Sequence, residues 1–391
     1  MPSSRFTFWV LILVVAIAGV SQGLTIPLLA VLLEEQGVST VVNGLNAAAL
    51  YIGILIISPF LEIPLRRIGY RSTILWGLAM VTLTIALLPL ISDLTVWFLL
   101  RMLMGIGDSC LHYSSQMWVT NIAAPKHRGR DLSLYGLAYG LGFSIGPLGL
   151  NLLPYGTWVP FAAVGIICLV AFGLLSRIRN AYPDPVESMG RQENRYAAVF
   201  RLGWLALIPS FLFGFMEASL NGSFPVYALR VGVSVEWVSL VLPSFVIGSI
   251  LLQMPLGALS DRVGRKRVMF VCALAGAAAF CLFPLAGANV WLMMLLLAVA
   301  GAAVGSFYSL GLAYAADILP AAMVPTAGII AGMNFSVASI IAPNVNGFLM
   351  DYFQPWMMFT VMALLLVGFA VSCQFFRRRG AGEGKTETVV A

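Results

Sequence analysis

Four ionisable side chains interrupt the long apolar stretches of this sequence. Arg101, Asp108 and His112 share one stretch, and Glu217 lies in another. Ionisable groups at the depth of a bilayer are costly, and they usually face a cavity or a partner. Because burial penalises the charged form of a carboxyl, Asp108 or Glu217 could take up a proton on one side of a membrane and release it on the other.

Glu217 is the first candidate for a proton carrier or for the counter-charge of a cation, because its own stretch offers no basic partner at that depth. A shift of 195 residues, described below, places Gln22 at the equivalent point of the first apolar stretch. Asn221 follows Glu217 by one helical turn and could hydrogen-bond a substrate or join neighbouring helices.

The second candidate is the pair Asp108 and His112. Together with Arg101, Gly105 and Ser115 they follow a helical spacing that places all five on one face, which we expect to line a central cavity. Asp108 and His112 lie about 6 Å apart along the axis and could exchange a proton. In the alternative interpretation, Asp108 only neutralises Arg101 or satisfies hydroxyl groups inside a bundle.

Membrane-spanning helices must position these groups. Of the 391 residues, 60% are hydrophobic and 10% are charged, whereas a soluble domain carries about 25% charged residues. The mean hydropathy is +0.94, which excludes a water-soluble protein. Apolar runs of about twenty residues can each cross a bilayer as a helix. Twelve spans are expected, at 7–33, 42–62, 73–92, 95–119, 131–153, 157–177, 202–228, 236–259, 267–288, 290–314, 323–350 and 354–376.

The reactive residue types do not form an enzyme-like or metal-binding pattern. His112 and His127 are apart from each other and from the cysteines, and no CxxC pair occurs. The five cysteines all fall inside apolar runs: Cys110, Cys168, Cys272, Cys281 and Cys373. We therefore expect no disulfide, no metal, no cofactor and no enzymatic activity.

The charges predict the orientation in the membrane. Twenty of the 22 basic residues lie at the N-terminus or in every second connection, and the exceptions are Arg101 and Arg230. This asymmetry is the positive-inside pattern, so both termini should be cytoplasmic and the protein should lie in the inner (plasma) membrane. The first run is too long for a signal peptide and should remain as a span. The net charge of +6 then reflects topology, with no nucleic-acid partner.

The two halves of the sequence repeat each other. A shift of 195 residues superimposes several glycine and proline positions: Gly37 on Gly232, Gly53 on Gly248, Gly69 on Gly264, Pro89 on Pro284 and Pro125 on Pro320. Parallel repeats of six spans predict two pseudo-symmetric six-helix bundles with a site between them. The expected units are a bundle at 1–180, a cytoplasmic linker at 181–200, a second bundle at 201–376 and a tail at 377–391.

One connection carries a recognisable motif. The segment from Gly257 to Arg267 resembles the G-x-L-x-D-R-x-G-R-K signature of the major facilitator superfamily. The matching residues are Gly257, Asp261, Arg262, Gly264, Arg265 and Lys266. The resemblance implies the twelve-span fold of that superfamily, an all-α membrane protein, and a loop that acts as a latch for one conformation. Independently of the resemblance, Gly264 permits a tight turn and the basic cluster suits anionic headgroups.

The equivalent loop of the first half keeps only part of the motif. Gly69, Arg67 and Arg71 are present, but Arg66 stands where the family has its acidic residue and Glu62 where it has glycine. The latch role cannot be carried over unchanged, although Glu62 could supply the negative partner one turn earlier.

Two further segments resemble motifs of proton-linked drug exporters in this superfamily. Arg101 to Gly107 has the R-x-x-x-G-x-G pattern, and Gly142, Gly146 and Pro147 fit the G-x-x-x-G-P motif of antiporters. The alternative interpretation is helix packing alone, because glycines four apart allow helices to approach closely.

These patterns predict a monomeric secondary transporter in the lipid bilayer that exports small amphipathic or cationic molecules in exchange for protons. Two alternatives stay open. One is an uptake carrier for a sugar, an organic acid or another metabolite, in which Arg101 would anchor an anionic substrate. The other is an exporter of a self-made siderophore or lipid precursor.

Overall fold

The computed structural model describes residues 4–123, 128–183, 195–320 and 323–376. Within these ranges, twelve helical segments are long and apolar enough to cross a membrane. Most of them begin and end within a few residues of the predicted spans, because the apolar runs set their length. The third begins at Glu62 instead of 73 and the seventh at Tyr196 instead of 202, because these two helices extend into the polar residues before the apolar run. The prediction of an all-α protein with twelve spans is confirmed.

The first half comprises the first six spans. Its helices are α1 (Ser4–Glu35), α2 (Thr40–Ile57), α3 (Glu62–Leu87), α4 (Leu94–Ile122), α5 (Arg128–Ile145), η3 (Gly146–Tyr155) and α6 (Val159–Ser176). The fifth span changes from α5 to the tighter 3₁₀ helix η3 at Gly146, directly before Pro147. Proline lacks the N–H that an α-helix needs, and the change of helix type at this point agrees with that.

The second half comprises the last six spans. Its helices are α7 (Arg195–Ala218), η4 (Ser219–Ser223), α8 (Phe224–Arg230), α9 (Val235–Val263), α10 (Arg265–Leu282), α11 (Val290–Val304), α12 (Phe307–Ile318), α13 (Val324–Tyr352) and α14 (Met357–Phe375). The seventh span therefore combines α7, α8 and the short π-helix η4 between them. The tenth span combines α11 and α12.

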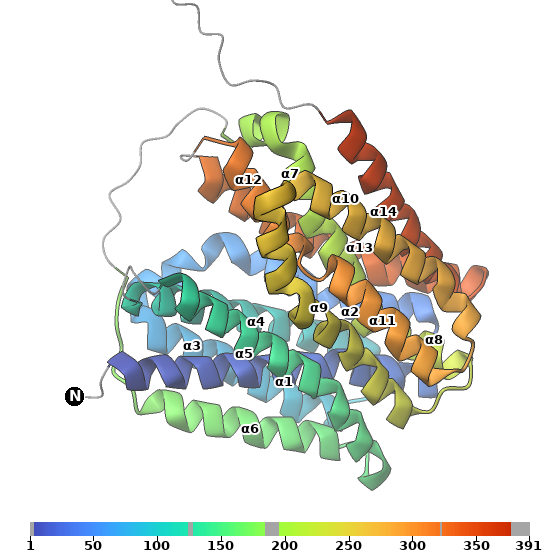
Figure 1. Ribbon diagram of the computed structural model, residues 1–391. Helices are drawn as coiled ribbons and strands as arrows, with labels where there is room; N and C mark the ends of the chain where they lie inside the picture. The colour runs from blue at the N-terminus through green and yellow to red at the C-terminus, as the bar shows by residue number, and fades with distance from the viewer. Residues whose placement is uncertain (1–3, 124–127, 184–194, 321–322, 377–391) are drawn as a thin grey trace, which may run out of the picture.

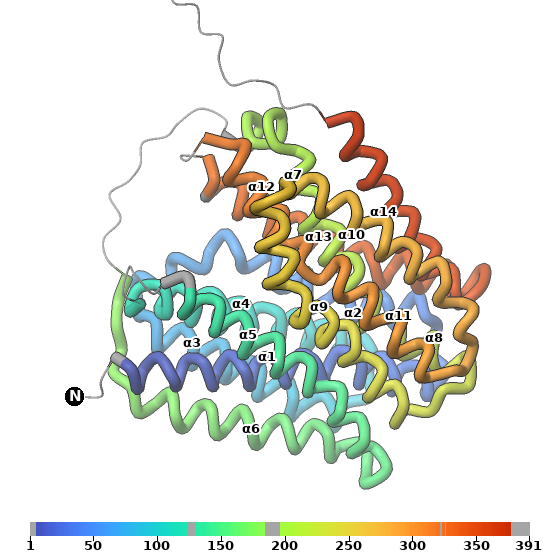
Figure 2. Tube along the Cα trace, in the orientation of Figure 1, coloured from blue at the N-terminus to red at the C-terminus, as the bar shows by residue number. Residues whose placement is uncertain are grey.

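The halves form two helix bundles that meet at one end and separate at the other (Figures 1 and 2). We call the end at which α1 begins the Ser4 side and the end at which it finishes the Glu35 side. The bundles contact each other through α2 with α13 and through η3 and α5 with α9. At the first contact, a Cβ added to Gly44 would collide with the Pro343 carbonyl oxygen, and one added to Gly347 with that of Thr40. The two backbones therefore touch.

Equivalent turns confirm the register of the repeat. Gly37 and Gly232 both have positive φ, at 71° and 86°. The residue after each turn bonds back in the same way, because Val38 N donates to Leu33 O at 3.0 Å and Val233 N to Ala228 O at 2.9 Å. All of these positions are related by the shift of 195 residues that the sequence predicted.

The structure describes only part of the predicted linker and none of the predicted tail. Residues 184–194 of the predicted linker and the whole predicted tail at 377–391 lie outside the described residues. The domain boundaries at 180 and 200 remain predictions.

Candidate functional site

Glu217 lies deep between the two halves, at the end of α7 and directly before the π-helix η4. Its side chain is nevertheless only half-buried. In the described part of the chain, no donor hydrogen-bonds its carboxyl group, while Tyr51 of α2 and Tyr139 of α5 lie within electrostatic range. An accessible, unpaired carboxyl at this depth could bind a proton or a cation.

Gln22 contributes to the same region from the first half. The Tyr139 hydroxyl donates a hydrogen bond to Gln22 Oε1 at 2.7 Å. Tyr139 lies within electrostatic range of Asp108 as well as of Glu217. The two positions that the repeat relates, Gln22 and Glu217, therefore both lie near Tyr139, which hydrogen-bonds the first of them.

Arg101 is held inside the first half. Its side chain is 1% exposed, and Nη1 donates to Asn46 Oδ1 of α2 at 3.3 Å. Its Nε has no hydrogen-bond partner among the described residues. No ion pair in the described structure joins Arg101 to Asp108, so the interpretation that Asp108 neutralises Arg101 has no direct contact to support it.

Asp108 is also buried, at 1% exposure, and neither carboxyl oxygen makes a hydrogen bond within the described part of the chain. Arg101 and Asp108 are therefore closed off from solvent in this conformation, and the role of this face of the fourth span as a cavity wall stays a prediction. The physical reason for the closure is Gly105, which lets α4 pack directly against the Leu50 backbone and closes the space around it. Gln22 and Tyr139 are polar side chains near Asp108.

His112 is half-buried and is surrounded by aromatic groups of α5. Its Nδ1 lies 3.4 Å from the Tyr135 hydroxyl, and its ring meets the Tyr139 ring edge-on at 4.7 Å. The Tyr135 hydroxyl in turn lies 2.8 Å from Ser115 Oγ. No hydrogen bond joins His112 to Asp108 in the described structure, so their predicted proton exchange would require an intermediate such as water.

The π-helix η4 was not predicted from the sequence. Asn346 of α13 donates through Nδ2 to Ser219 Oγ at 2.8 Å and to Ser223 Oγ at 3.4 Å, at the two ends of η4. Asn221, predicted as a substrate or packing residue, donates to the Glu217 carbonyl oxygen at 2.8 Å. Short π-helices occur often at functional sites. Gly222 within η4 and Pro225, two residues after it, are local sequence signals for this break.

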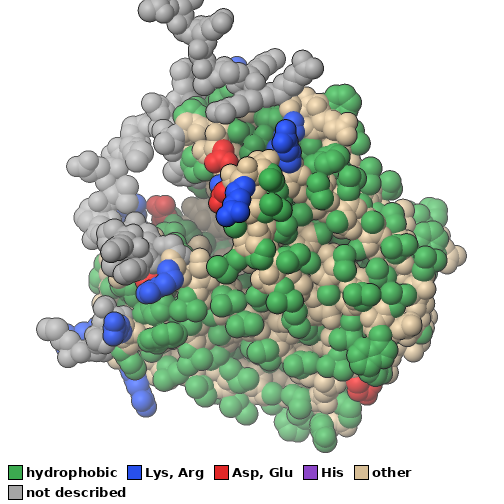
Figure 3. Space-filling view, in the orientation of Figure 1, with side chains coloured by type: hydrophobic (Ala, Val, Ile, Leu, Met, Phe, Trp, Pro, Cys, Tyr) green, Lys and Arg blue, Asp and Glu red, His purple; other side chains and the backbone are tan. Residues whose placement is uncertain are grey.

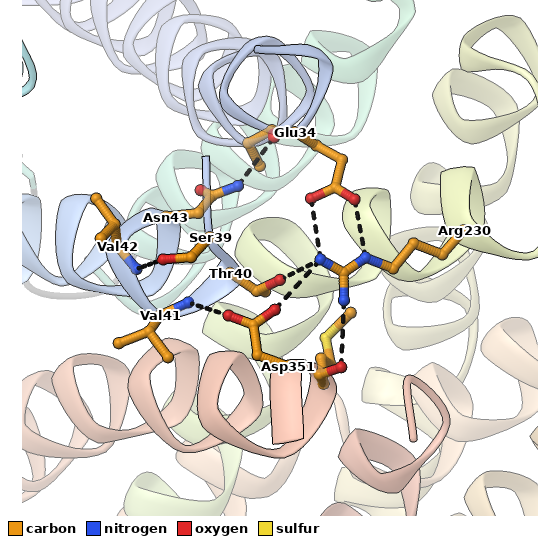
Figure 4. A network of polar contacts seen from close by, with 10 residues as sticks. Glu34, Ser39, Thr40, Val41, Val42, Asn43, Arg230 and Asp351 are labelled. Atoms are coloured by element: carbon orange, nitrogen blue, oxygen red, sulfur yellow. Dashed lines mark hydrogen bonds and ion pairs between the residues drawn. The ribbon is translucent and has the colours of Figure 1, made fainter. Parts of the chain in front are cut away.

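A polar network closes the Glu35 side (Figure 4). Arg230 of α8 binds Glu34 of α1, with Nε 2.8 Å from Oε1, and it also contacts Thr40 at 2.5 Å and Asp351 at 3.3 Å. Asp351 of α13 accepts a hydrogen bond from Val41 N at the start of α2, at 3.1 Å. Charged and polar groups of both halves are therefore tied together at this end.

The motif loops on the Ser4 side each bind their own half. Arg265 pairs with Asp261 at 2.8 Å and with Asp317 of α12 at 2.6 Å, and Lys266 donates to the Phe376 carbonyl at 2.7 Å. Arg262 and Arg67 are exposed, and Gly264, like Gly69, has positive φ. The predicted latch role is not tested by these contacts, because none of them crosses between the halves.

The loop of the first half is anchored by other means. Arg71 donates from Nη1 to the Ile178 carbonyl at 2.9 Å, and its backbone N–H donates to Asn180 Oδ1 at 2.9 Å. Glu62 pairs with Arg66 at 3.4 Å as an exposed pair one turn apart. Glu62 therefore does have a basic partner, within its own helix.

The antiporter-like motif of the fifth span packs against α1. A Cβ on Gly142 would collide with the Ala16 carbonyl oxygen, and one on Gly146 with the backbone at Gly23. Close helix packing is thus the observed role of these glycines.

The surface is hollowed between the two halves on the flank formed by α5 and α9 (Figure 3). The hollow lies toward the Ser4 side, where the bundles separate, whereas the Glu35 side is held closed by the Arg230 network. Glu217, Gln22, Asp108 and His112 lie between these two ends.

Comparison with known proteins agrees with this architecture. The chain is 41% identical over 369 residues to the Bacillus subtilis protein named Uncharacterized MFS-type transporter YfkF, with 93% of each chain covered. It is 24% identical over 343 residues to the Escherichia coli protein named Uncharacterized MFS-type transporter YcaD, with 85% of each covered. The crystal structure of the nucleoside transporter NupG shares the fold, with a TM-score of 0.77 and 14% identity over 94% of this chain and 98% of that one; a mutant of it gives 0.79.

A family model matches nearly the whole chain, in two overlapping parts at residues 11–244 and 206–389. Together with the twelve spans in two bundles, this match identifies the chain as a multi-pass membrane transporter. The chain belongs to the Major Facilitator Superfamily.

Proposed function

We propose that this chain exports small amphipathic cations in exchange for protons. The observation that carries the proposal is the carboxyl group of Glu217, which is accessible at the centre of the protein and has no basic partner in the described structure. A proton and a cation would compete for this group, so that protonation displaces the substrate and deprotonation restores the site.

The aromatic groups around Glu217 support an amphipathic substrate. Tyr51 meets Phe335 edge-on at 6.5 Å, and Phe335 in turn contacts Phe213 and Tyr308 at about the same distance. Aromatic faces attract cations and bury apolar surface at the same time. These rings come from both halves, so a ligand bound among them would contact both.

The direction of export depends on the orientation in the membrane. We infer from the positive-inside pattern that the Ser4 side is cytoplasmic and that both termini face the cytoplasm of a cell with this protein in its plasma membrane. The bundles are then open toward the cytoplasm and closed outside, the state that would receive a substrate from the cell.

An uptake carrier is the second candidate. NupG, which shares the fold, is a nucleoside transporter, and Gln22 with Tyr139 could hydrogen-bond a neutral polar solute. An anionic substrate is less well supported, since Arg101 is buried and bound to Asn46.

Transport by purified protein in proteoliposomes, with pH gradients of both signs, tests the proposal. Radiolabelled tetraethylammonium and uridine represent a cation and a nucleoside. We expect a gradient-driven flux of the cation in the direction opposite to the proton flux, and we expect Glu217→Gln to abolish it. Glu236→Gln, which alters an exposed carboxyl on the Glu35 side, is the control.

Unchanged gradient-driven cation transport in Glu217→Gln would remove the role proposed for this residue. Uridine flux in the same direction as the proton flux, without cation flux, would favour the uptake carrier.

A further inference from the structure

A short segment of α9 is exposed on all sides. Residues 251–255 are five consecutive exposed residues within the span, and Leu251 and Met254 are 67% and 84% exposed. Consecutive residues of an α-helix point about 100° apart, so five of them cover more than the full circumference. A helix that only faced lipid would be exposed on one side, and this segment therefore lacks a described neighbour on its inner side as well.

The missing neighbour is α5. The two helices approach each other at Gly140, whose Cβ position would lie 3.9 Å from Ile250 Cδ1. One turn farther toward the Ser4 side, a Cβ on Gly136 would meet no described atom within 4 Å, and the same holds for Gly257 of α9. The contact between α5 and α9 thus ends near Gly140, and the helices diverge from there.

The divergence lies at the depth of the membrane. Gly136 falls within the span Arg130–Tyr155, and the exposed segment falls within Val235–Val263. Figure 3 shows the hollow from a direction across the spans, in which the α5 and α9 flank faces the viewer. With these spans across a bilayer, the opening would face hydrocarbon as well as water at the Ser4 end.

The inner edge of the opening leads to the candidate site. Tyr139 directly precedes Gly140, bonds to Gln22, and lies within electrostatic range of Glu217. A molecule passing between α5 and α9 would reach the unpaired carboxyl of Glu217 from the lipid without first entering the water at the Ser4 end.

We propose that the gap between α5 and α9 is a lateral entrance through which cationic amphiphiles pass from the lipid leaflet on the Ser4 side to Glu217. This inference rests on the proposed function and adds the route and the substrate class. The large exposed side chains on these stretches of α5 and α9 are mostly apolar, which suits an alkyl chain: Leu137, Leu141, Leu251, Leu252 and Met254, with the polar Gln253 among them. The exposed segment 251–255 carries no charge, whereas the carboxyl group of Glu217 lies inside the protein. This arrangement suits a molecule whose positive headgroup enters first and binds Glu217.

A filled gap tests the entrance. Gly136→Trp places a large side chain in space that is empty of described atoms, so the fold should tolerate it. The probes are dodecyltrimethylammonium, which partitions into lipid, and tetraethylammonium, which stays in water. We expect Gly136→Trp to lower the initial transport rate of the long-chain probe by about tenfold and to leave that of tetraethylammonium near the wild-type value. Gly368→Trp in α14, where a Cβ also meets nothing within 4 Å, is the matched control.

The outcomes separate the two proposals. If neither probe is transported by the wild-type protein, the proposed function fails. If both are transported and Gly136→Trp slows them equally, or slows neither, the lateral entrance is wrong while the function stands. Thermal unfolding in detergent shows whether each tryptophan variant remains folded.

Discussion

Arg230 in α8 and Glu34 in α1 form an ion pair of 2.8 Å that joins the equivalent ends of the seventh and first spans. The side chains are 27% and 18% exposed, and Thr40 and Asp351 bind the same guanidinium group. Removal of the pair should destabilise the state in which the Glu35 side is closed by about 1 kcal/mol, or roughly a fivefold shift in population.

Arg230→Gln should therefore open the Glu35 side more often. Ala47→Cys reports this opening, because Ala47 Cβ lies at the contact between the halves, 3.6 Å from the Cβ position of Gly222. In a background without the five native cysteines, we expect a membrane-impermeant maleimide to label this residue faster in Arg230→Gln. Arg179→Gln, which alters an exposed arginine, is the control, and equal labelling rates in all three proteins would contradict the prediction.

The contact between α2 and α13 offers an independent prediction. Because a Cβ on Gly44 would collide with the Pro343 carbonyl, Gly44→Ala should push the two helices apart. We expect a lower melting temperature and faster labelling of Ala47→Cys than in the wild type. Gly222→Ala adds a Cβ in ordinary van der Waals contact, 3.6 Å from Ala47, and should change the melting temperature little. A Gly44→Ala protein as stable as Gly222→Ala would show that the close approach is not needed.

Much of the fold could be predicted because it depends on periodicity and length. Apolar runs defined the twelve spans, and the shift of 195 residues correctly paired Gly37 with Gly232 and Gly69 with Gly264, each with positive φ. These features are local, since each turn requires a residue that tolerates positive φ at that point.

The contacts between the halves could not be predicted, because they join residues that are far apart in the sequence. Glu34 and Arg230 are separated by 196 positions. Each of them lies at the end of a span, where charged residues are common, so neither indicates a partner in the sequence. The available signal was that Arg230 broke the positive-inside pattern. The close packing around Arg101 and Asp108 could not be predicted for a related reason, since helical spacing shows which residues share a face but not what packs against it.

Asn346 should stabilise the π-helix that follows Glu217. Its side chain is fully buried and bonds to Ser219 and Ser223, and buried hydrogen bonds of this kind contribute about 1 kcal/mol each. We expect Asn346→Ala to lower the free energy of unfolding by about 1–3 kcal/mol and to shift the pH dependence of cation transport, because the backbone that carries Glu217 moves.

Asn344→Ala is the matched control for this prediction. The Asn344 side chain bonds only within its own helix, to the Ile340 carbonyl at 2.6 Å, so its loss should have a small effect on both measurements. If Asn346→Ala changes stability but leaves the pH profile unchanged, Asn346 supports the fold and does not position Glu217.

Gln22→Glu should add a second proton-binding group at the position that the repeat relates to Glu217. A carboxylate oxygen can accept the hydrogen bond that Tyr139 now donates to Gln22 Oε1, so the geometry can be kept. Two nearby carboxyls titrate as a coupled pair. We therefore expect the pH dependence of cation transport to become steeper and the number of protons exchanged per cation to rise. The proton-to-cation ratio in proteoliposomes measures this change directly. Gln22→Asn keeps an amide without an added charge and should retain the original ratio, and an unchanged ratio in Gln22→Glu would place this side chain outside the proton pathway.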